Sequence, residues 1–186
     1  PENLSFPEAA ATAEVFFTAF YNVCLLGELQ PQETLLVHGG GSGVGTAAIQ
    51  LAKAMEASVI TTAGSWDKVE KCLQLGADHA VNYREEDFAQ RVSAITQGRG
   101  VDVILDWIGA SYLSKHVELL RTRGRLVIIG LMGGAKGEIP LAPLLTKRLR
   151  VMGSVLRSQS LQEKAAIARA FQERVLPLLQ EKKVHP

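Results

Sequence analysis

Short apolar runs alternate with amphipathic stretches along most of the chain. Buried strands are predicted where apolar residues run together between polar residues or glycines, at 34–38, 58–62, 79–82, 101–105, 125–129 and 150–156. Helices are predicted where apolar residues recur at helical spacing, at 7–26, 44–55, 68–75, 87–97, 112–120 and 161–179. The first of these helices has at most one break, and Pro177 kinks or ends the last.

The order of these elements predicts a parallel sheet, because strands and helices alternate along the chain. Right-handed crossovers then place helices on both faces of the sheet. We therefore expect one α/β domain over residues 1–186, a doubly wound Rossmann fold with a six-stranded parallel sheet. Its ligand should lie beyond the carboxyl ends of the strands.

The composition agrees with one domain and argues against several classes of function. A chain of 186 residues that is 47% hydrophobic can bury one substantial core, but it is too short for two ordinary domains. Twenty basic and 19 acidic residues leave a net charge of +1, which offers no broad attraction to nucleic acid or an anionic membrane. Because no apolar run approaches the roughly 20 residues that span a bilayer, and no signal peptide opens the chain, we expect a cytoplasmic protein.

The chain ends and the cysteines add two smaller expectations. The sequence starts at Pro1 without an initiator methionine and stops without a natural stop signature, which predicts a domain excised from a longer protein. Cys24 and Cys72 lie in predicted helices and have no partner at metal-ligand spacing. We expect reduced, structural thiols and no metal site.

The segment Gly40–Gly45 joins the first predicted strand to a helix and is the candidate phosphate-binding loop. Gly40 would allow the tight turn, Gly43 would let the backbone approach a pyrophosphate, and Gly45 would let helix and strand pack closely. The free N–H groups of the helix start would then face the phosphates. Ser42 stands where the common G-x-G-x-x-G pattern has glycine, so the prediction depends on the strand–turn–helix context, and a mere tight connection is the alternative.

Two rival nucleotide-binding patterns do not fit. A P-loop needs a lysine directly before Thr46, and Gly45 occupies that position. A short-chain dehydrogenase needs a Tyr-x-x-x-Lys pair, in which the lysine lowers the pKa of the tyrosine. Tyr83 is followed four residues later by Asp87, and Tyr112 by His116.

The end of the second predicted strand favours NADPH over NADH. NAD-specific sites carry an acidic residue there, which binds the ribose 2′-hydroxyl, whereas this strand runs into Gly64 and Ser65. Ser65 can donate to a phosphate, Lys68 can supply positive charge one helical turn later, and Gly64 keeps the loop open. We interpret Asp67 as support for the following helix N-terminus, and a solvated surface charge is the alternative for Lys68.

Further motifs recur in a fixed order over essentially the whole chain: Pro7–Ala11 before Thr18–Phe20, His38–Gly45, Gly64–Lys68 before Leu75–Ala77, Asn82–Tyr83, Leu105–Asp106 with Gly109, and Gly124–Arg125 before Gly130. In this order they resemble the quinone oxidoreductase branch of the zinc-independent medium-chain dehydrogenase/reductase superfamily. The segments Ser42–Leu51, Gly130–Gly134 and Leu156–Ser158 look like the tumour-suppressor-inducible subgroup of that branch.

The resemblance implies an NADPH-dependent enzyme that transfers hydride to quinones or α,β-unsaturated carbonyls without zinc. It implies 2′-phosphate contacts around Lys68 and pyrophosphate contacts at Gly43, and it brings Met132 and Ser154 to the nicotinamide side. The full set of implied cofactor-binding positions is Thr18, Gly40, Ser42, Gly43, Val44, Gly45, Gly64, Ser65, Lys68, Tyr83, Trp107, Gly130, Leu131, Met132, Ser154 and Leu156. Packing roles for Thr18, Tyr83 and Met132 are the alternatives.

The same resemblance implies an N-terminal GroES-like domain that this sequence lacks, and the substrate would lie between the two domains. We therefore name no catalytic acid or base in the chain. His38 and His79 lie in strand contexts and are interpreted as core or edge residues, and nothing supports a catalytic role for Glu14 or His116.

Alternatives remain open at this level. Enoyl-thioester reductases of the same superfamily, including those inside polyketide and fatty-acid synthases, share the glycine loop. A non-enzymatic NADPH-binding or structural protein is the second alternative. Pairing of the edge strand 150–156 in two copies would make a homodimer with a continuous sheet.

Overall fold

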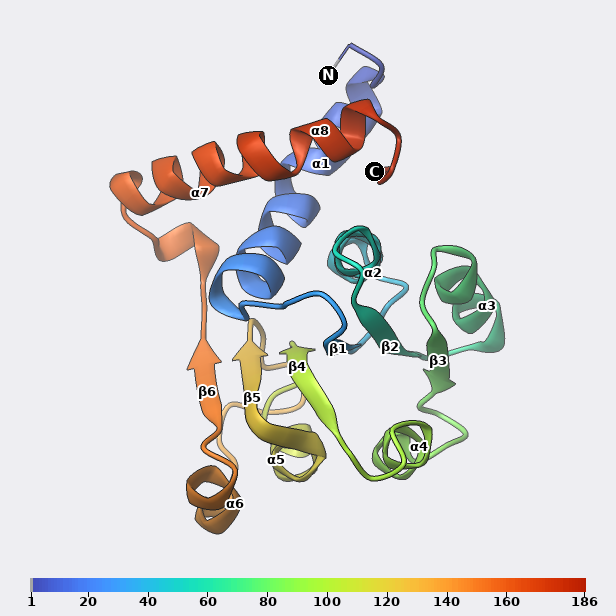
Figure 1. The fold of residues 1–186 in the computed structure, drawn as a ribbon, viewed down its shortest axis with the longest axis vertical. Coiled ribbons are helices and arrows are strands. Elements are labelled where there is room, and N and C mark those ends of the chain that lie inside the picture. Colours follow the sequence, from blue (N-terminus) through green and yellow to red (C-terminus); the bar gives the residue numbers. More distant parts are fainter. Residues whose placement is uncertain (1) are drawn as a thin grey trace.

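The computed structural model describes residues 2–186 and confirms the doubly wound fold (Figure 1). Six parallel strands form one sheet in the order β3-β2-β1-β4-β5-β6. They are β1 (Thr34–Val37), β2 (Ser58–Ala63), β3 (His79–Asn82), β4 (Val101–Asp106), β5 (Leu120–Ile128) and β6 (Arg150–Gly153). The strand order reverses between β1 and β4, and folds of this kind bind their ligands beyond the carboxyl ends at that switch point.

The helices follow the strands as predicted, with one addition. They are α2 (Gly43–Ala54), α3 (Trp66–Gln74), α4 (Phe88–Ile95), α5 (Leu113–Leu119), α6 (Leu141–Thr146), α7 (Leu161–Arg174) and α8 (Leu176–Gln180), with short 3₁₀ turns η2 (Ala110–Tyr112) and η3 (Leu156–Ser158). Helix α6 was not predicted, because Pro140 and Pro143 argue against a helix in sequence. Pro140 is the N-cap and Pro143 lies in the first turn, where a missing N–H costs no helical hydrogen bond.

Two strands differ in length from the prediction by more than one residue. Strand β5 begins at Leu120, because Leu120 pairs with Val101 ahead of an irregularity in the β4–β5 register. The polar residues from Arg121 to Gly124 hide this extension in the sequence. Strand β6 ends at Gly153, and the following chain leaves the sheet for η3, so the predicted strand 150–156 is too long by three residues.

The N-terminal helix is continuous but changes its winding. Helix α1 (Phe6–Ala19) starts with a capping box between Ser5 and Glu8 and passes directly into a π-helix, η1 (Phe20–Leu26). Contrary to the expectation from sequence, these 21 residues are long and apolar enough to cross a bilayer by length and composition alone. Phe16 and Phe20 lie buried in the core, which accounts for part of this apolar character.

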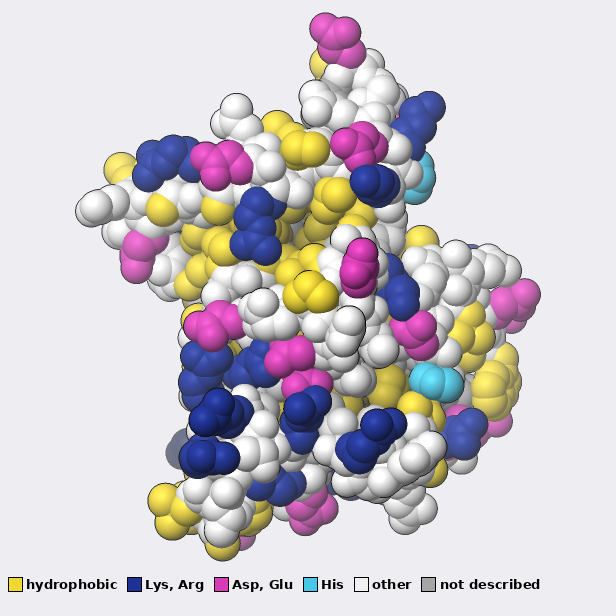
Figure 2. All heavy atoms as spheres, in the orientation of Figure 1, with side chains coloured by type: hydrophobic (Ala, Val, Ile, Leu, Met, Phe, Trp, Pro, Cys, Tyr) yellow, Lys and Arg dark blue, Asp and Glu magenta, His cyan; other side chains and the backbone are white. Residues whose placement is uncertain are grey.

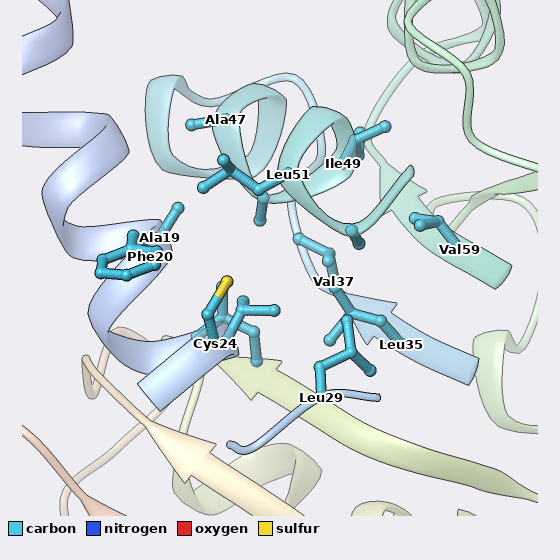
Figure 3. Packing of buried hydrophobic residues seen from close by; sticks show 14 of the residues in the cluster. Ala19, Phe20, Cys24, Leu29, Leu35, Val37, Ala47, Ile49, Leu51 and Val59 are labelled. Atoms are coloured by element: carbon cyan, nitrogen blue, oxygen red, sulfur yellow. The ribbon is translucent and has the colours of Figure 1, made fainter. Parts of the chain in front are cut away.

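Alternate residues of the strands feed two separate cores, one on each face of the sheet. Leu35 and Val37 share one core with residues of α1, η1 and α2 (Figure 3), and this core also contains residues of α7 and α8. Leu36, between them, packs in the other core with residues of α4 and α5. Both faces of β1 are therefore buried, as its uninterrupted apolar run predicts.

The C-terminal helices close the first of these cores. Helix α7 crosses α1 (Figure 1), and the rings of Phe17 and Phe171 stack there with centroids 3.9 Å apart. The predicted break is confirmed, since α7 ends at Arg174 and α8 begins at Leu176 with Pro177 in its first turn.

Candidate functional site

The loops that follow the strands gather at one end of the sheet. The arrowheads of β4, β5 and β6 point toward the end where α1 passes into η1 (Figure 1). The predicted site residues lie in these loops, at the start of α2 and in the helices beside them. The fold therefore brings together segments that are more than a hundred residues apart in the sequence.

The start of α2 is built to receive an anion. Ser42 is the N-cap, and its hydroxyl accepts a hydrogen bond from the Gly45 N–H (3.1 Å). The N–H groups of Gly43 and Val44 have no hydrogen-bond partner within residues 2–186. Unpaired N–H groups and the positive end of the helix dipole favour a phosphate at this position.

The glycines of the loop act in a different way from the prediction. The left-handed residue of the turn is Gly39 (φ 56°), whereas φ is not positive at Gly40. Gly40 lacks a side chain because a Cβ there would overlap the Thr61 hydroxyl. A Cβ on Gly45 would lie 2.5 Å from the Gly39 carbonyl oxygen, so close packing of helix and strand at Gly45 is confirmed.

Gly43 faces a helix as well as the open loop. A Cβ added to Gly43 would lie 2.8 Å from Cγ1 of Val15 in α1. The absence of a side chain at Gly43 is therefore required for α1 to approach α2, whatever the loop binds. The sequence offered only the approach of a pyrophosphate as the reason for this glycine.

A second group of side chains surrounds the end of β2. A Cβ on Gly64 would lie 2.8 Å from the Tyr83 hydroxyl and 3.4 Å from Nε of Arg84, and the stem of Lys68 lies over Gly41. Ser65 is the N-cap of α3, but its side chain makes no capping hydrogen bond. Lys68 and Arg84 form no ion pair within the described residues. The Tyr83 hydroxyl and the unpaired Arg84 guanidinium thus lie at the end of β2, Ser65 follows Gly64 directly in the chain, and the unpaired Lys68 lies over the neighbouring loop. The end of β2 itself carries no carboxylate.

Arg84 was not predicted from the sequence. It directly follows the predicted Tyr83 at the end of β3, and a cation next to that motif was the available signal. The next residue in the chain, Glu85, accepts hydrogen bonds from the Trp66 indole N–H and from the Asn82 amide, each at 3.1 Å. Glu85 therefore braces the loop without neutralising Arg84.

The loops after β4 and β5 are tied to each other through the backbone. Met132 N–H donates to the Trp107 carbonyl (3.1 Å), and Gly133 N–H donates to that of Ile108 (2.6 Å). The Trp107 ring lies over Gly39, where a Cβ would come within 2.8 Å of it. Gly130 packs against the Cβ and the backbone of Trp107, and a Cβ added to Gly130 would lie 2.8 Å from the Trp107 Cβ. Leu131 and Met132 project into solvent, with 54% and 82% of their surface exposed.

Thr18, Ser154 and Leu156 come from α1, from the end of β6 and from η3. The buried Asn22 links the first two, because its amide donates to the Thr18 carbonyl (2.8 Å) and its oxygen bonds to the Ser154 hydroxyl. The Thr18 hydroxyl itself donates to Glu14. Leu156 has left β6 for η3 and is half-buried. Asn22 was also missed, since an asparagine inside an apolar helix carries no positional signal.

Beneath these loops lies a fully buried polar cluster of His38, His116 and Asp106. The two Nε2 atoms of the histidines are 2.8 Å apart, and Nδ1 of His116 faces Asp106 Oδ2 at 3.8 Å. Burial lowers the pKa of His116 to about 3, and burial with the neighbouring His116 holds the pKa of His38 well below its usual value. Burial raises the pKa of Asp106 to about 6. Both histidines are therefore neutral at physiological pH.

The remaining predicted histidine and the cysteines are placed as expected. His38 is a core residue, and His79 is exposed in the edge strand β3. Cys24 and Cys72 are free and buried.

Basic side chains gather at the opposite end of the sheet, away from the glycine loop (Figure 2). There Arg150 pairs with Glu28 and Arg121 pairs with Asp102. Lys147 donates to three carbonyls at the end of α5. These charges support the fold at that end of the sheet.

The doubly wound sheet, the anion-binding start of α2 and the site at the strand ends define an NAD(P)-binding domain. The chain belongs to a family of the medium-chain dehydrogenase/reductase superfamily, since the family model described as zinc-binding dehydrogenase matches residues 43–173.

Curated relatives include two kinds of protein. The chain is 36% identical over 147 residues to quinone oxidoreductase 1 of Escherichia coli, a match that covers 79% of this chain and 45% of that protein. It is also 36% identical over 130 residues to a phenolphthiocerol/phthiocerol polyketide synthase of Mycobacterium tuberculosis, covering 70% of this chain and 6% of the synthase. The chain thus spans less than half the length of either relative.

Solved structures show the same two kinds. The E. coli quinone oxidoreductase complexed with NADPH superposes with a TM-score of 0.84 at 31% identity, covering 99% of this chain and 56% of that one. A putative enoyl reductase domain of a polyketide synthase gives a TM-score of 0.79 at 31% identity, covering 91% of this chain and 93% of that one.

The family description raises the question of zinc, and the buried cluster does not fit it. Ligand atoms around tetrahedral zinc stand about 3.3 Å apart when each lies about 2.0 Å from the metal. The two Nε2 atoms at 2.8 Å are instead at hydrogen-bond distance. Asp106 accepts from the N–H groups of Ile108 and Gly109, and its carboxylate is committed to the turn after β4.

Proposed function

We propose that the chain is the NADPH-binding domain of a zinc-independent oxidoreductase that reduces quinones or α,β-unsaturated carbonyls. The choice of NADPH rests on the end of β2, which has no acidic residue. The hydroxyls of Ser65 and Tyr83 and the cations of Lys68 and Arg84 lie around it and in the neighbouring loop. A 2′-phosphate would find hydrogen-bond donors and opposite charge there, whereas a ribose 2′-hydroxyl would find no carboxylate acceptor. The quinone substrate class is supported by the relatives.

The proposed cofactor site has two halves. The adenosine end consists of Gly64, Ser65, Lys68, Tyr83 and Arg84, and the nicotinamide end consists of Trp107, Gly130–Met132, Thr18 and Ser154. Between them, Gly43 and Val44 N–H groups would hold the pyrophosphate. The bound cofactor supplies the hydride, and the residues of this chain bind and orient it and cover one side of the reacting ring.

Separate titrations of the protein with NADPH and with NADH test the proposal directly. Titration calorimetry with NADPH and NADH should give an affinity for NADPH at least about tenfold higher, because the 2′-phosphate gains charge-assisted hydrogen bonds worth about 1.5–3 kcal/mol. Equal affinities, or a preference for NADH, would contradict it.

A second candidate activity is reduction of enoyl thioesters. The putative enoyl reductase domain supports it, since that solved chain and this one cover each other over nine-tenths of their lengths. The full-length protein should be assayed with NADPH against a short-chain quinone and an enoyl thioester. The substrate with the higher kcat/KM decides between the two activities.

We also propose a homodimer that pairs two copies of β6. This strand is an edge of the sheet, and Val151 is 38% exposed on it. Unpaired backbone groups on an edge strand favour such pairing. Light scattering that gave a strictly monomeric mass would overturn this proposal.

A further inference from the structure

The buried cluster lies where the two central turns of the site begin. His38 directly follows β1, and Asp106 is the last residue of β4, so the two stand side by side at the switch point. His116 comes from α5 on the face below. All three side chains are between 0% and 1% exposed. Buried polar groups that touch neither solvent nor ligand are costly unless they fix a particular arrangement.

The hydrogen bonds of the cluster run in one direction. The Thr62 hydroxyl accepts from the Gly39 N–H (3.2 Å) and can donate to Nδ1 of His38 (3.1 Å). Nε2–H of His38 then donates to Nε2 of His116 (2.8 Å), which leaves the His116 proton on Nδ1. That proton faces the Asp106 carboxylate. The opposite direction would set an imidazole lone pair against the carboxylate.

Each nitrogen of His116 therefore faces the anchor of a different turn. On one side His38 and Thr62 hold Gly39, the left-handed residue under the Trp107 ring. On the other side Asp106 accepts from the N–H groups of Ile108 (2.8 Å) and Gly109 (2.9 Å), and so shapes the turn that contains Trp107. The loop from Gly130 to Gly133 donates backbone hydrogen bonds to the carbonyls of that same turn.

We propose that His116 is a positioning residue that holds the turns after β1 and β4 in one arrangement and thereby orients the nicotinamide end of the site. This inference rests on the proposed function. Nδ1 of His116 has no hydrogen-bond partner at normal distance within the described residues. We therefore ascribe its effect to the orientation of the imidazole toward Asp106, and not to a strong hydrogen bond. The residues of the adenosine end follow β2 and β3 in the chain. None of Gly64, Ser65, Lys68, Tyr83 and Arg84 takes part in these hydrogen bonds, although Thr62 within β2 does.

The experiment compares two ligands on the full-length protein. NADPH occupies both ends of the site, and 2′,5′-ADP occupies only the adenosine end. His116→Leu should weaken NADPH binding about tenfold and leave 2′,5′-ADP within about twofold of wild type. The ratio of the two dissociation constants is the readout, because a general loss of stability does not move it.

Conservative variants separate the two directions of His116. Glutamine places its amide near the position of Nε2 and keeps the contact to His38, and asparagine places its amide near Nδ1 and keeps the contact to Asp106. In each of these two variants, the ratio of the NADPH and 2′,5′-ADP dissociation constants should lie between those of wild type and of His116→Leu. If His116→Leu does not fold, the glutamine and asparagine variants are compared with wild type in its place. Val117→Ala is the matched control, since it opens a cavity at the next buried position of α5 and should lower stability without moving the ratio.

Two outcomes would overturn the inference. One is a set of His116 variants whose ratio equals that of wild type, and the other is equal weakening of both ligands. A wild-type protein that binds neither ligand would contradict the proposed function itself, and the inference would fall with it.

Discussion

The two ends of the site are built by different means. At the adenosine end, exposed side chains from α3 and the β3 loop surround a glycine, and each could change without disturbing the core. At the nicotinamide end, the backbone of three loops is fixed by hydrogen bonds and by buried polar groups beneath it. If the proposed function holds, single surface substitutions should change the specificity for the cofactor, whereas substitutions that change the geometry of the nicotinamide end should also disturb folding.

The largest effect is expected at the junction of the two ends. Gly45→Ala would press a methyl group against the Gly39 carbonyl at 2.5 Å, so α2 must shift away from β1. We expect a loss of about 3 kcal/mol in the free energy of unfolding and at least about a hundredfold loss of NADPH affinity. Thermal unfolding and titration calorimetry measure the two. Gly41→Ala is the control for the stability measurement, because its Cβ would meet only the flexible Lys68 side chain at 3.3 Å.

The second prediction tests whether the adenosine end is separable. Lys68→Ala with Arg84→Ala should reduce NADPH affinity by about a hundredfold and leave NADH affinity unchanged, because only the 2′-phosphate uses these charges. Lys71→Ala, on the exposed side of the same helix, should change neither. Parallel weakening of both cofactors would show that the two cations support the loop and do not read the phosphate.

The smallest effect is a pH dependence of stability, and it comes from the buried cluster of His38, His116 and Asp106 beneath the nicotinamide end. The depressed pKa values of His38 and His116 mean that the unfolded chain takes up two protons as pH falls below 6.5, which destabilises the fold. The raised pKa of Asp106 acts in the opposite sense, since the folded chain takes up one proton near pH 6. One net proton remains, so stability should fall by about 1.4 kcal/mol per pH unit between pH 6 and 5.

Urea unfolding at several pH values measures this slope. His116→Asn removes one of the two histidine protons, so the contribution of the cluster should become flat over the same range. A slope unchanged by that substitution would mean that groups outside the cluster set the acid sensitivity. His79→Asn is the control, because His79 is exposed in β3.

The sequence was sufficient for the sheet and for most of its helices. Runs such as Leu35–Val37 and Val103–Leu105 are apolar on both faces, which is what a central parallel strand requires. The sequence was insufficient where local composition and tertiary pairing disagree. The polar start of β5 joins the sheet through Leu120 and Val101, and α6 forms despite two prolines.

The site was predictable where it follows the chain and unpredictable where it crosses the fold. The sequence predicted the positions of Ser42, Gly45 and Ser65 at helix starts, because a turn and a helix start leave a local pattern. Asn22 meets Ser154 across 132 positions, and His38 meets His116 across 78. No local pattern encodes such contacts, since they depend on which strands become neighbours.

The π-helical turn η1 sets a rotational register for the whole N-terminal segment. If the winding of this turn is kept, removing one residue between Phe20 and Leu26 would rotate everything before it by about 100°. Val15 would then leave Gly43, and Thr18 would leave the side of the site that it shares with Ser154 through Asn22. Insertions and deletions in this stretch should therefore be far less tolerated than the substitution of any exposed residue around it.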